Sequence, residues 1–386
     1  MSLFLEYGYT SFNKHGEELC GDMVSCVKKD GYTTLVLADG LGSGVKANIL
    51  STLTSKILST MVSNNIPMVE CIETIVETLP VCKERGVAYS TFSVIHLNNN
   101  GEGYMFEFDN PQCIFLNKGL PQDLKRQEFN ILDKKIYKSD LKLKNQDVII
   151  VMSDGVPHAG IGKIMNLGWQ REDIIDYLKT NIKSNMSARC IANILASASE
   201  ALYLGEPGDD TTVAAVKIRE EQAVNIMIGP PVKPEDCNVY VGDFLANEGL
   251  KIVCGGTTSQ IVADFLNEEI EADISYMDCE LPPVGHIKGI DLVTEGVITL
   301  RKLIELSEIY LKIDSNVPKN FIKKDGASQL ANFLFEEATD VNFFVGQAVN
   351  EAHKGLPIDS TLKFKLVEKL SENLKSMGKR ITIKYY

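Results

Sequence analysis

Aspartates that flank apolar, β-branched segments are the residues of this sequence best suited to chemistry. They are Asp22 in GDMVS, Asp39 after LVLA, Asp154 after VIIVMS, and the pair Asp209-Asp210 before TTVAAV. The ends of strands in one sheet can converge, and converging unpaired carboxylates repel each other strongly unless a cation lies between them. Hard divalent ions such as Mg²⁺ and Mn²⁺ bind through oxygen ligands of this kind. We therefore expect a divalent-metal site, to which Gly40 adds its backbone carbonyl because glycine allows a close approach.

An Asp-Gly pair is, by itself, most often only a turn. Asp30-Gly31 and Asp325-Gly326 are interpreted in this way, and Asp39 taken alone is compatible with either role. The ordered set of acidic motifs along one chain favours metal binding. Neither cysteine nor histidine occurs in these motifs at ligand spacing. A structural zinc site is therefore not expected.

The acidic motifs lie in a strand-rich region that also contains helical segments. Apolar runs predict strands over 20–29, 32–39, 89–98, 103–110, 113–119, 146–156 and 211–218, and helical spacing predicts helices over 45–64, 68–79, 171–180 and 186–204. The Asp30-Gly31 pair is a hairpin signal between the first two strands. The pattern predicts antiparallel sheets with helices beside them.

The length of 386 residues favours two domains. The best boundary is the proline-containing stretch 221–236, which includes Gly229-Pro230-Pro231 and Pro234. Proline breaks strand pairing, as connectors between domains often do. We expect a first domain over 1–220, a linker over 221–236, and a smaller α/β domain over 237–386.

A glycine turn in the second domain is a candidate ligand site. The segment KIVCGGTTSQ reads as a strand, a turn and the start of a helix. Gly255 and Gly256 would allow close backbone approach, and Thr257 and Thr258 offer hydroxyls at a helix N-terminus. These features suit an anion or phosphate. A plain helix cap explains the same residues, so both interpretations stay open, as does a purely regulatory or dimerising domain.

Taken together, the acidic motifs resemble the metal-dependent PPM (PP2C-type) serine/threonine phosphatases, and specifically their SpoIIE-like bacterial branch. The residues that carry the resemblance are Gly21-Asp22, Ala38-Asp39-Gly40-Leu41-Gly42-Ser43-Gly44 with Ala47, Ser153-Asp154-Gly155, and Asp209-Asp210-Thr211-Thr212. It covers about residues 1–220. The resemblance implies an α+β fold, in which a PP2C-like antiparallel β-sandwich is flanked by helices, with two metal ions at one edge.

The resemblance also implies roles for individual residues. Asp39 would bridge two Mn²⁺ or Mg²⁺ ions, and the carbonyl of Gly40 would bind one of them. Asp154 and Asp209 would complete the ligands of one ion, and together with Asp39 they are the expected catalytic residues. Asp22 would bind the second ion, directly or through a water. Asp210 occupies a position where the family often has asparagine, so we expect it behind the metal ligands.

The sequence departs from the wider family at two places. Leu41 stands where many eukaryotic members have a histidine that suits protonation of the leaving group, a departure shared by the SpoIIE-like branch. No clear arginine near Asp22 is available to hold phosphate; Lys14 and His15 are interpreted as solvated side chains. Substrate affinity is then expected from protein–protein contacts. The resemblance also makes the helix over 45–64 a candidate switch element, with a plain packed helix as the alternative.

The bulk composition narrows the class of partner and compartment. A formal charge of −13 and a pI near 5.0 argue against binding to nucleic acid or an anionic membrane. The nine cysteines include no Cys-x-x-Cys pair and are interpreted as small buried hydrophobes in a reducing compartment. The N-terminal segment lacks a signal-peptide pattern, and no run of about 18 apolar residues occurs. We expect a cytoplasmic protein.

The predicted function is that of a metal-dependent protein serine/threonine phosphatase, regulated by its C-terminal domain. Water activated by two metal ions would hydrolyse phosphoserine or phosphothreonine on a partner protein. Besides this phosphoprotein substrate, a second copy of the chain and a small-molecule effector of the C-terminal domain are candidate partners. The alternative is a weak or inactive phosphatase fold that acts as a sensor or scaffold, with a phosphorylated small ligand at the C-terminal domain. The three carboxylates Asp39, Asp154 and Asp209 favour the enzyme.

Overall fold

The chain forms two compact units, Met1–Glu220 and Glu221–Tyr386. This computed structural model describes residues 3–78, 90–131, 134–273, 284–312, 325–348 and 361–386. In the described residues, no helix has the length and apolar character needed to cross a membrane. Among the described cysteines, Cys71, Cys113 and Cys254 are buried.

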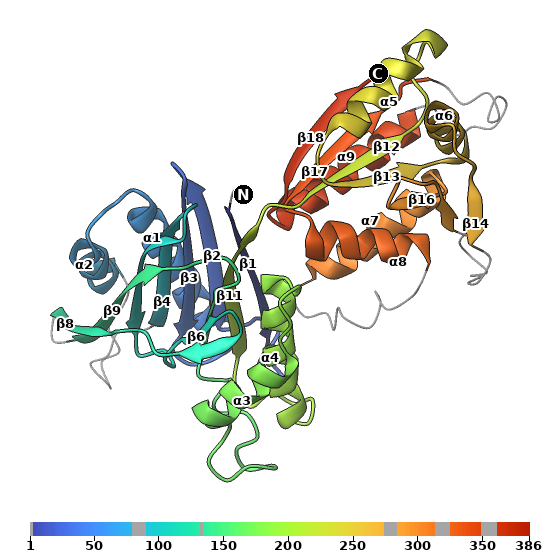
Figure 1. The fold of residues 1–386 in the computed structure, drawn as a ribbon. Helices are drawn as coiled ribbons and strands as arrows, with labels where there is room; N and C mark the ends of the chain where they lie inside the picture. The colour runs from blue at the N-terminus through green and yellow to red at the C-terminus, as the bar shows by residue number, and fades with distance from the viewer. Residues whose placement is uncertain (1–2, 79–89, 132–133, 274–283, 313–324, 349–360) are drawn as a thin grey trace. The chain divides into compact units, whose positions relative to one another are not determined.

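Unit 1 contains two antiparallel sheets (Figure 1). The strands of the first, in spatial order, are β1 (Leu3–Phe12), β11 (Thr211–Glu220), β10 (Val148–Met152), β6 (Ile114–Asn117) and β7 (Leu120–Gln122). Those of the second are β2 (Asp22–Lys29), β3 (Tyr32–Gly40), β4 (Ser90–Asn98), β5 (Glu102–Phe108), β9 (Lys134–Lys142) and β8 (Gln127–Ile131). Asp30 and Gly31, with φ of 50° and 78°, make the expected turn between β2 and β3.

Alternation along the central strands explains how the two sheets pack. Leu35 and Leu37 of β3 share a buried cluster with Ile149 and Val151 of β10, so this cluster lies between the sheets. Because successive side chains of a strand point to opposite faces, Val36 of β3 belongs to a different cluster. The expected antiparallel sandwich is confirmed, and its central strands are apolar on both faces because helices cover their outer sides.

Two pairs of helices cover the outer faces of the sandwich (Figure 1). Helices α1 (Gly44–Ser63) and α2 (Met68–Thr78) pack on the sheet that contains β3. Helices α3 (Arg171–Asn181) and α4 (Ala188–Leu202) pack on the sheet that contains β10. The Oγ atoms of Ser59 in α1 and Ser25 in β2 lie 3.0 Å apart, in a small-residue contact that lets α1 approach closely.

Unit 2 is a doubly wound α/β unit. Its sheet has the order β14 (Glu271–Asp273), β15 (Val284–His286), β16 (Leu292–Thr294), β13 (Leu250–Cys254), β12 (Ala223–Ile228), β17 (Asp340–Val345) and β18 (Arg380–Tyr385). From β16 to β18 neighbouring strands are parallel, and β14 and β15 add an antiparallel edge. The smaller α/β domain expected from the sequence is thus present.

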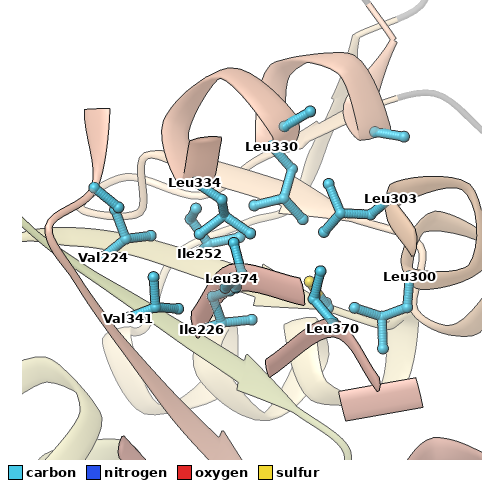
Figure 2. Packing of buried hydrophobic residues seen from close by; sticks show 14 of the residues in the cluster. Val224, Ile226, Ile252, Leu300, Leu303, Leu330, Leu334, Val341, Leu370 and Leu374 are labelled. Atoms are coloured by element: carbon cyan, nitrogen blue, oxygen red, sulfur yellow. The ribbon is translucent and has the colours of Figure 1, made fainter. Parts of the chain in front are cut away.

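Helices cover both faces of this parallel sheet. Those on one face are η1 (Pro234–Asp236), α5 (Cys237–Ala246) and α6 (Gly256–Leu266); those on the other are α7 (Val297–Leu311), α8 (Gly326–Ala331) with the π-helical turn η3 (Asn332–Glu337), and α9 (Thr361–Ser376). Figure 2 shows the second contact, in which Ile226 and Ile252 of the sheet face Leu334 and Leu374. The apolar strands need this double cover because both of their faces are buried.

The stretch 221–236 differs from the expected linker. Its first half contains β12, which pairs with β13 on one side and β17 on the other. The apolar run AVNIMI therefore forms a central strand, and only Glu221 and Gln222 separate it from β11. Asp325 also differs from the expected simple turn, because its carboxylate accepts a hydrogen bond from the backbone N–H of Ser328 and caps α8.

Candidate metal centre

Strands β2 and β3 place Asp22 and Asp39 opposite each other. The two residues are register partners in the antiparallel ladder, at the end of the hairpin far from its turn. Asp22 is buried, with only 4% of its surface exposed. Neither of its carboxylate oxygens has a hydrogen-bond partner within the described part of the chain. A buried carboxylate without a partner is costly, so this position calls for a ligand or a proton.

Strands β10 and β11 bring the other acidic motifs together. The N–H of Ser153 donates to the carbonyl of Thr212 (3.0 Å), and the N–H of Thr212 donates to the Oγ of Ser153 (2.9 Å). Gly155 is required here, because a Cβ at this position would lie 2.2 Å from the backbone oxygen of Asp210. The turn that carries Asp154 is therefore held against the start of β11.

Helix α1 packs directly on the turn that follows Asp39. The N–H of Gly40 donates to the carbonyl of Gly21 (3.1 Å), which ties this turn to the residue before Asp22. A Cβ on Gly40 would lie 2.1 Å from the carbonyl oxygen of Ala47 in α1. Only glycine fits between the metal motif and the helix, which explains its place after Asp39.

Burial and mutual repulsion act on the whole group of carboxylates. Burial is the main cause that raises the pKa of Asp39, and the charges of Asp22, Asp154 and Asp209 raise it further. The pKa of Asp22 is also raised by burial, with smaller contributions from Asp210 and Asp154, while the nearby hydroxyls of Ser153 and Thr212 act in the opposite direction. The carboxylates of the two sheets thus repel one another electrostatically, as expected where a cation would bind between them.

The structure brings together all four acidic motifs named from the sequence. The strands come from both sheets: Asp22 and Asp39 belong to the sheet of β2 and β3, whereas Asp154 and Asp209 flank β10 and β11 of the other. Asp210 lies behind the group, 4% exposed, where one carboxylate oxygen accepts from the N–H of Lys14 (3.0 Å) and the other has no partner among the described residues.

Two side chains at this site were not predicted. Ligand atoms of Asp154, His158 and Asp209 all lie within 4.8 Å of one another, so a histidine does occur at ligand spacing. The ammonium group of Lys14 lies 4.0 Å from a carboxylate oxygen of Asp209, and the Lys14 side chain, interpreted from the sequence as solvated, is 38% exposed. The available signal for His158 was its position four residues after Asp154, which one helical turn brings to the same side.

The glycine turn of unit 2 is held by hydrogen bonds within that unit. Gly255 has a φ of 111°, and Gly256 begins α6. The hydroxyl of Thr258 accepts from the N–H of Gly229 (2.9 Å), and the hydroxyl of Ser259 donates to the carbonyl of Gly255 (2.9 Å). The turn is thus held by contacts to the end of β12, and ligand binding by Gly255, Gly256, Thr257 and Thr258 stays a prediction.

The sequence comparison agrees with this geometry. Residues 29–219 match the family model of stage II sporulation protein E (SpoIIE). Unit 1 is SpoIIE-like. Among curated proteins, no relative matches this chain.

Solved structures with a similar fold include several phosphatases. The PP2C phosphatase domain with a fragment of the regulatory domain of SpoIIE from Bacillus subtilis is 20% identical with a TM-score of 0.48; the match covers 56% of this chain and 64% of that one. The RsbU and RsbW domains of Rv1364c from Mycobacterium tuberculosis are 17% identical (TM-score 0.46; 64% of this chain, 68% of that chain). The catalytic domain of the serine/threonine phosphatase PstP, solved with two manganese ions, is 14% identical (TM-score 0.38; 57% and 100%).

Proposed function

We propose that the chain is a metal-dependent protein serine/threonine phosphatase that hydrolyses phosphoserine or phosphothreonine on a partner protein. The observation that carries this proposal is the buried carboxylate group, in which both oxygens of Asp22 lack a partner within the described residues and Asp39 is flanked by three other negative charges. Oxygen-only ligands of this kind fit Mn²⁺ or Mg²⁺. The match to the SpoIIE family supports the same reaction.

The residues would divide the work as follows. Asp39, with the carbonyl of Gly40, would lie between two metal positions. The buried Asp22 would hold the ion on the inner side of the site. Asp154 and Asp209 would hold the ion on the outer side, toward solvent. When bound, two divalent ions lower the pKa of a shared water, orient it for attack on phosphorus and neutralise phosphoryl charge.

Lys14 supplies positive charge at the outer side of the site. Its ammonium group is about two-fifths exposed, at 38%, and lies next to Asp209. A phosphate monoester that enters from solvent would meet this charge. The side chain thus takes part of the role of the arginine that the sequence lacks, while Leu41, 37% exposed, offers an apolar contact for the protein substrate.

Regulation would act through α1 and unit 2. Because Gly40 packs against Ala47 without space for a Cβ, a shift of α1 has to move the turn that holds Asp39. This contact supports a switch role for α1. We propose that unit 2 senses a signal, through a small-molecule effector or a second copy of the chain, and that the protein acts in the cytoplasm on a phosphoprotein partner.

The test is phosphatase turnover of the full chain on p-nitrophenyl phosphate and on a phosphoserine peptide. Wild type and Asp39→Asn are compared in Mn²⁺, in Mg²⁺ and in EDTA. We expect turnover that depends on metal and falls by at least about 100-fold in the variant, as for loss of a main transition-state contact. Wild-type turnover that is equal in EDTA and Mn²⁺ would contradict the proposal. Absence of turnover together with tight Mn²⁺ binding would favour the sensor or scaffold instead.

A further inference from the structure

The candidate metal centre has two chemically different sides. The inner side consists of Asp22 and Asp39, which are register partners and offer only carboxylate oxygens. The outer side consists of Asp154, His158 and Asp209, whose ligand atoms lie within 4.8 Å of one another. Ligands of one ion, each about 2.0–2.2 Å from it, are separated by distances of this order. The outer side therefore offers a nitrogen as well as oxygens.

The turn over residues 154–158 fixes the position of the histidine. The N–H of His158 donates to the carbonyl of Asp154 (3.0 Å), which closes a single helical turn and brings the two side chains to the same side. Their Nδ1 and Oδ2 atoms lie 3.7 Å apart. The hydroxyl of Tyr203 donates to the carbonyl of Gly155 (2.8 Å), and the N–H of Trp169 donates to the carbonyl of Pro157 (2.8 Å). Contacts from two other segments thus hold the turn.

A second observation, at Asp22, supports a cation at this group. Asp22 is buried, and both of its carboxylate oxygens lack a partner within the described residues. The side chains of Asp154 and His158 are 46% and 50% exposed, respectively. An ion at the outer side would therefore be reachable from solvent, where substrate arrives.

We infer that His158 is a metal ligand, and that the outer position holds a divalent transition metal with nitrogen affinity, such as Mn²⁺, Fe²⁺, Co²⁺ or Zn²⁺, in preference to Mg²⁺. Imidazole suits Fe²⁺ and Zn²⁺ best. Mn²⁺ binds oxygen ligands well but, as a transition metal, accepts imidazole more readily than Mg²⁺ does. The inference rests on the proposed metal centre and adds a ligand and a metal preference to it. The inner position, built from carboxylates, carries no such preference.

The test uses metal-free full-length protein and measures binding of Mn²⁺ and of Mg²⁺ by titration calorimetry for wild type and His158→Gln. We expect the variant to lose roughly tenfold or more in Mn²⁺ affinity, with little change for Mg²⁺. His158→Asp, which restores an oxygen ligand, is expected to bind Mg²⁺ more tightly than wild type. His15→Gln is the matched control, since His15 is an exposed histidine on the loop that carries Lys14.

Pulsed electron paramagnetic resonance of the Mn²⁺-loaded protein gives a direct readout. We expect nitrogen coupling to Mn²⁺ in wild type and in His15→Gln, and its loss in His158→Gln. Mn²⁺ binding without nitrogen coupling, or an equal change of both affinities in His158→Gln, would overturn the inference and leave the proposed phosphatase intact. If wild type binds neither ion, or if Asp39→Asn leaves both affinities unchanged, the metal centre of the proposed function is overturned as well.

Discussion

The two units differ in whether the buried polar groups at their strand ends have hydrogen-bond partners. In unit 1, carboxylate oxygens of Asp22 and Asp210 at the metal centre are buried without a hydrogen-bond partner within the described residues, as is one of Asp147 outside it. In unit 2, no described side-chain oxygen or nitrogen is buried in that way. Both regions consist of apolar strands that end at glycine-containing turns, so the difference lies in how the polar atoms are used.

The strand ends of unit 2 are closed by their own hydrogen bonds. The buried hydroxyl of Tyr240 shares its one proton between the carbonyls of Gly229 (3.0 Å) and Phe344 (2.9 Å), which lie at the ends of β12 and β17. Lys363 donates to the carbonyl of Gly346, and burial lowers the pKa of its ammonium group to about 8. These groups stabilise the turns of unit 2 itself. Satisfied polar groups indicate structure, whereas the unsatisfied carboxylate of Asp22, opposite Asp39 and among further negative charges, indicates a site.

The largest expected effect that separates the units is on turnover. Asp209→Asn should reduce the Mn²⁺-dependent hydrolysis of a phosphoserine peptide by roughly 100-fold or more, because it removes a charge that the metal and the transition state require. Thr258→Val in unit 2 should leave turnover within about twofold. Steady-state kinetics of both variants provides the check. A Thr258→Val protein as inactive as Asp209→Asn would show that the turn of unit 2 belongs to the reaction.

Metal should stabilise unit 1 and leave unit 2 unchanged. At 100 times its dissociation constant a ligand adds about 2.7 kcal/mol to the free energy of unfolding. For a domain of this size each 1 kcal/mol raises the Tm by roughly 2–4 °C. Calorimetry in EDTA and in Mn²⁺ should therefore show one transition that rises by about 5–10 °C and one that stays. Equal shifts of both transitions would contradict the contrast between the units.

The metal-free protein should lose stability as the pH rises. The pKa of Asp39 is raised in the folded state, so the folded state holds this proton more tightly than the unfolded state does. The resulting stabilisation is present at acidic pH and is lost as the pH rises above the ordinary carboxyl range through neutrality. In EDTA, the Tm of unit 1 should fall over this range, and Asp39→Asn should flatten the dependence. A Tm that rises with pH in EDTA would contradict this prediction.

Tyr240 offers the converse test in unit 2. Tyr240→Phe removes the donor and leaves the carbonyls of Gly229 and Phe344 without this bond. We expect the free energy of unfolding of unit 2 to drop by roughly 1–3 kcal/mol, with Mn²⁺ affinity unchanged. Denaturant titration followed by calorimetric Mn²⁺ binding measures both quantities. A loss of Mn²⁺ affinity would mean that the two units are coupled through this core.

The smallest expected effect concerns Lys14. Because its ammonium group is partly exposed and screened by solvent, Lys14→Ala should raise the KM for a phosphopeptide only a few-fold and leave kcat nearly unchanged. Lys14→Arg serves as the matched variant and should retain the wild-type KM. A large drop in kcat would instead place Lys14 among the groups that act on the transition state.

Residue types at strand ends were sufficient to predict the acidic group. Each of the four aspartates lies beside an apolar run, namely Asp22, Asp39, Asp154 and Asp209. A residue in that position lies at the end of a strand in whatever order the strands are arranged. His158 was missed because its position depends on the backbone turn that begins at Asp154, and no periodic pattern marks such a turn. The sheet to which each of the four carboxylates belongs could not be predicted, because pairing between distant strands is a tertiary property.

The boundary of unit 2 illustrates the same limit. The run AVNIMI carries a clear strand signal, but the following Gly229-Pro230-Pro231 suggested a connector. Those prolines lie beyond the end of β12, where no ladder hydrogen bond is needed. The order of the parallel strands, with β12 between β13 and β17, depends on contacts between segments more than 100 residues apart, such as Asn225 and Asn342.

The pairing of β1 with β11 makes unit 1 a nearly closed loop of chain. Leu3 is the register partner of Glu220, so the first and last described residues of the unit are neighbours. A unit whose ends meet is suited to circular permutation and to insertion into a surface loop of another protein. A short linker joining residues 3 and 220, with new ends opened at the turn over residues 98–101, should therefore preserve the sandwich and its carboxylates. The same geometry would allow the metal centre to be transplanted as a single module.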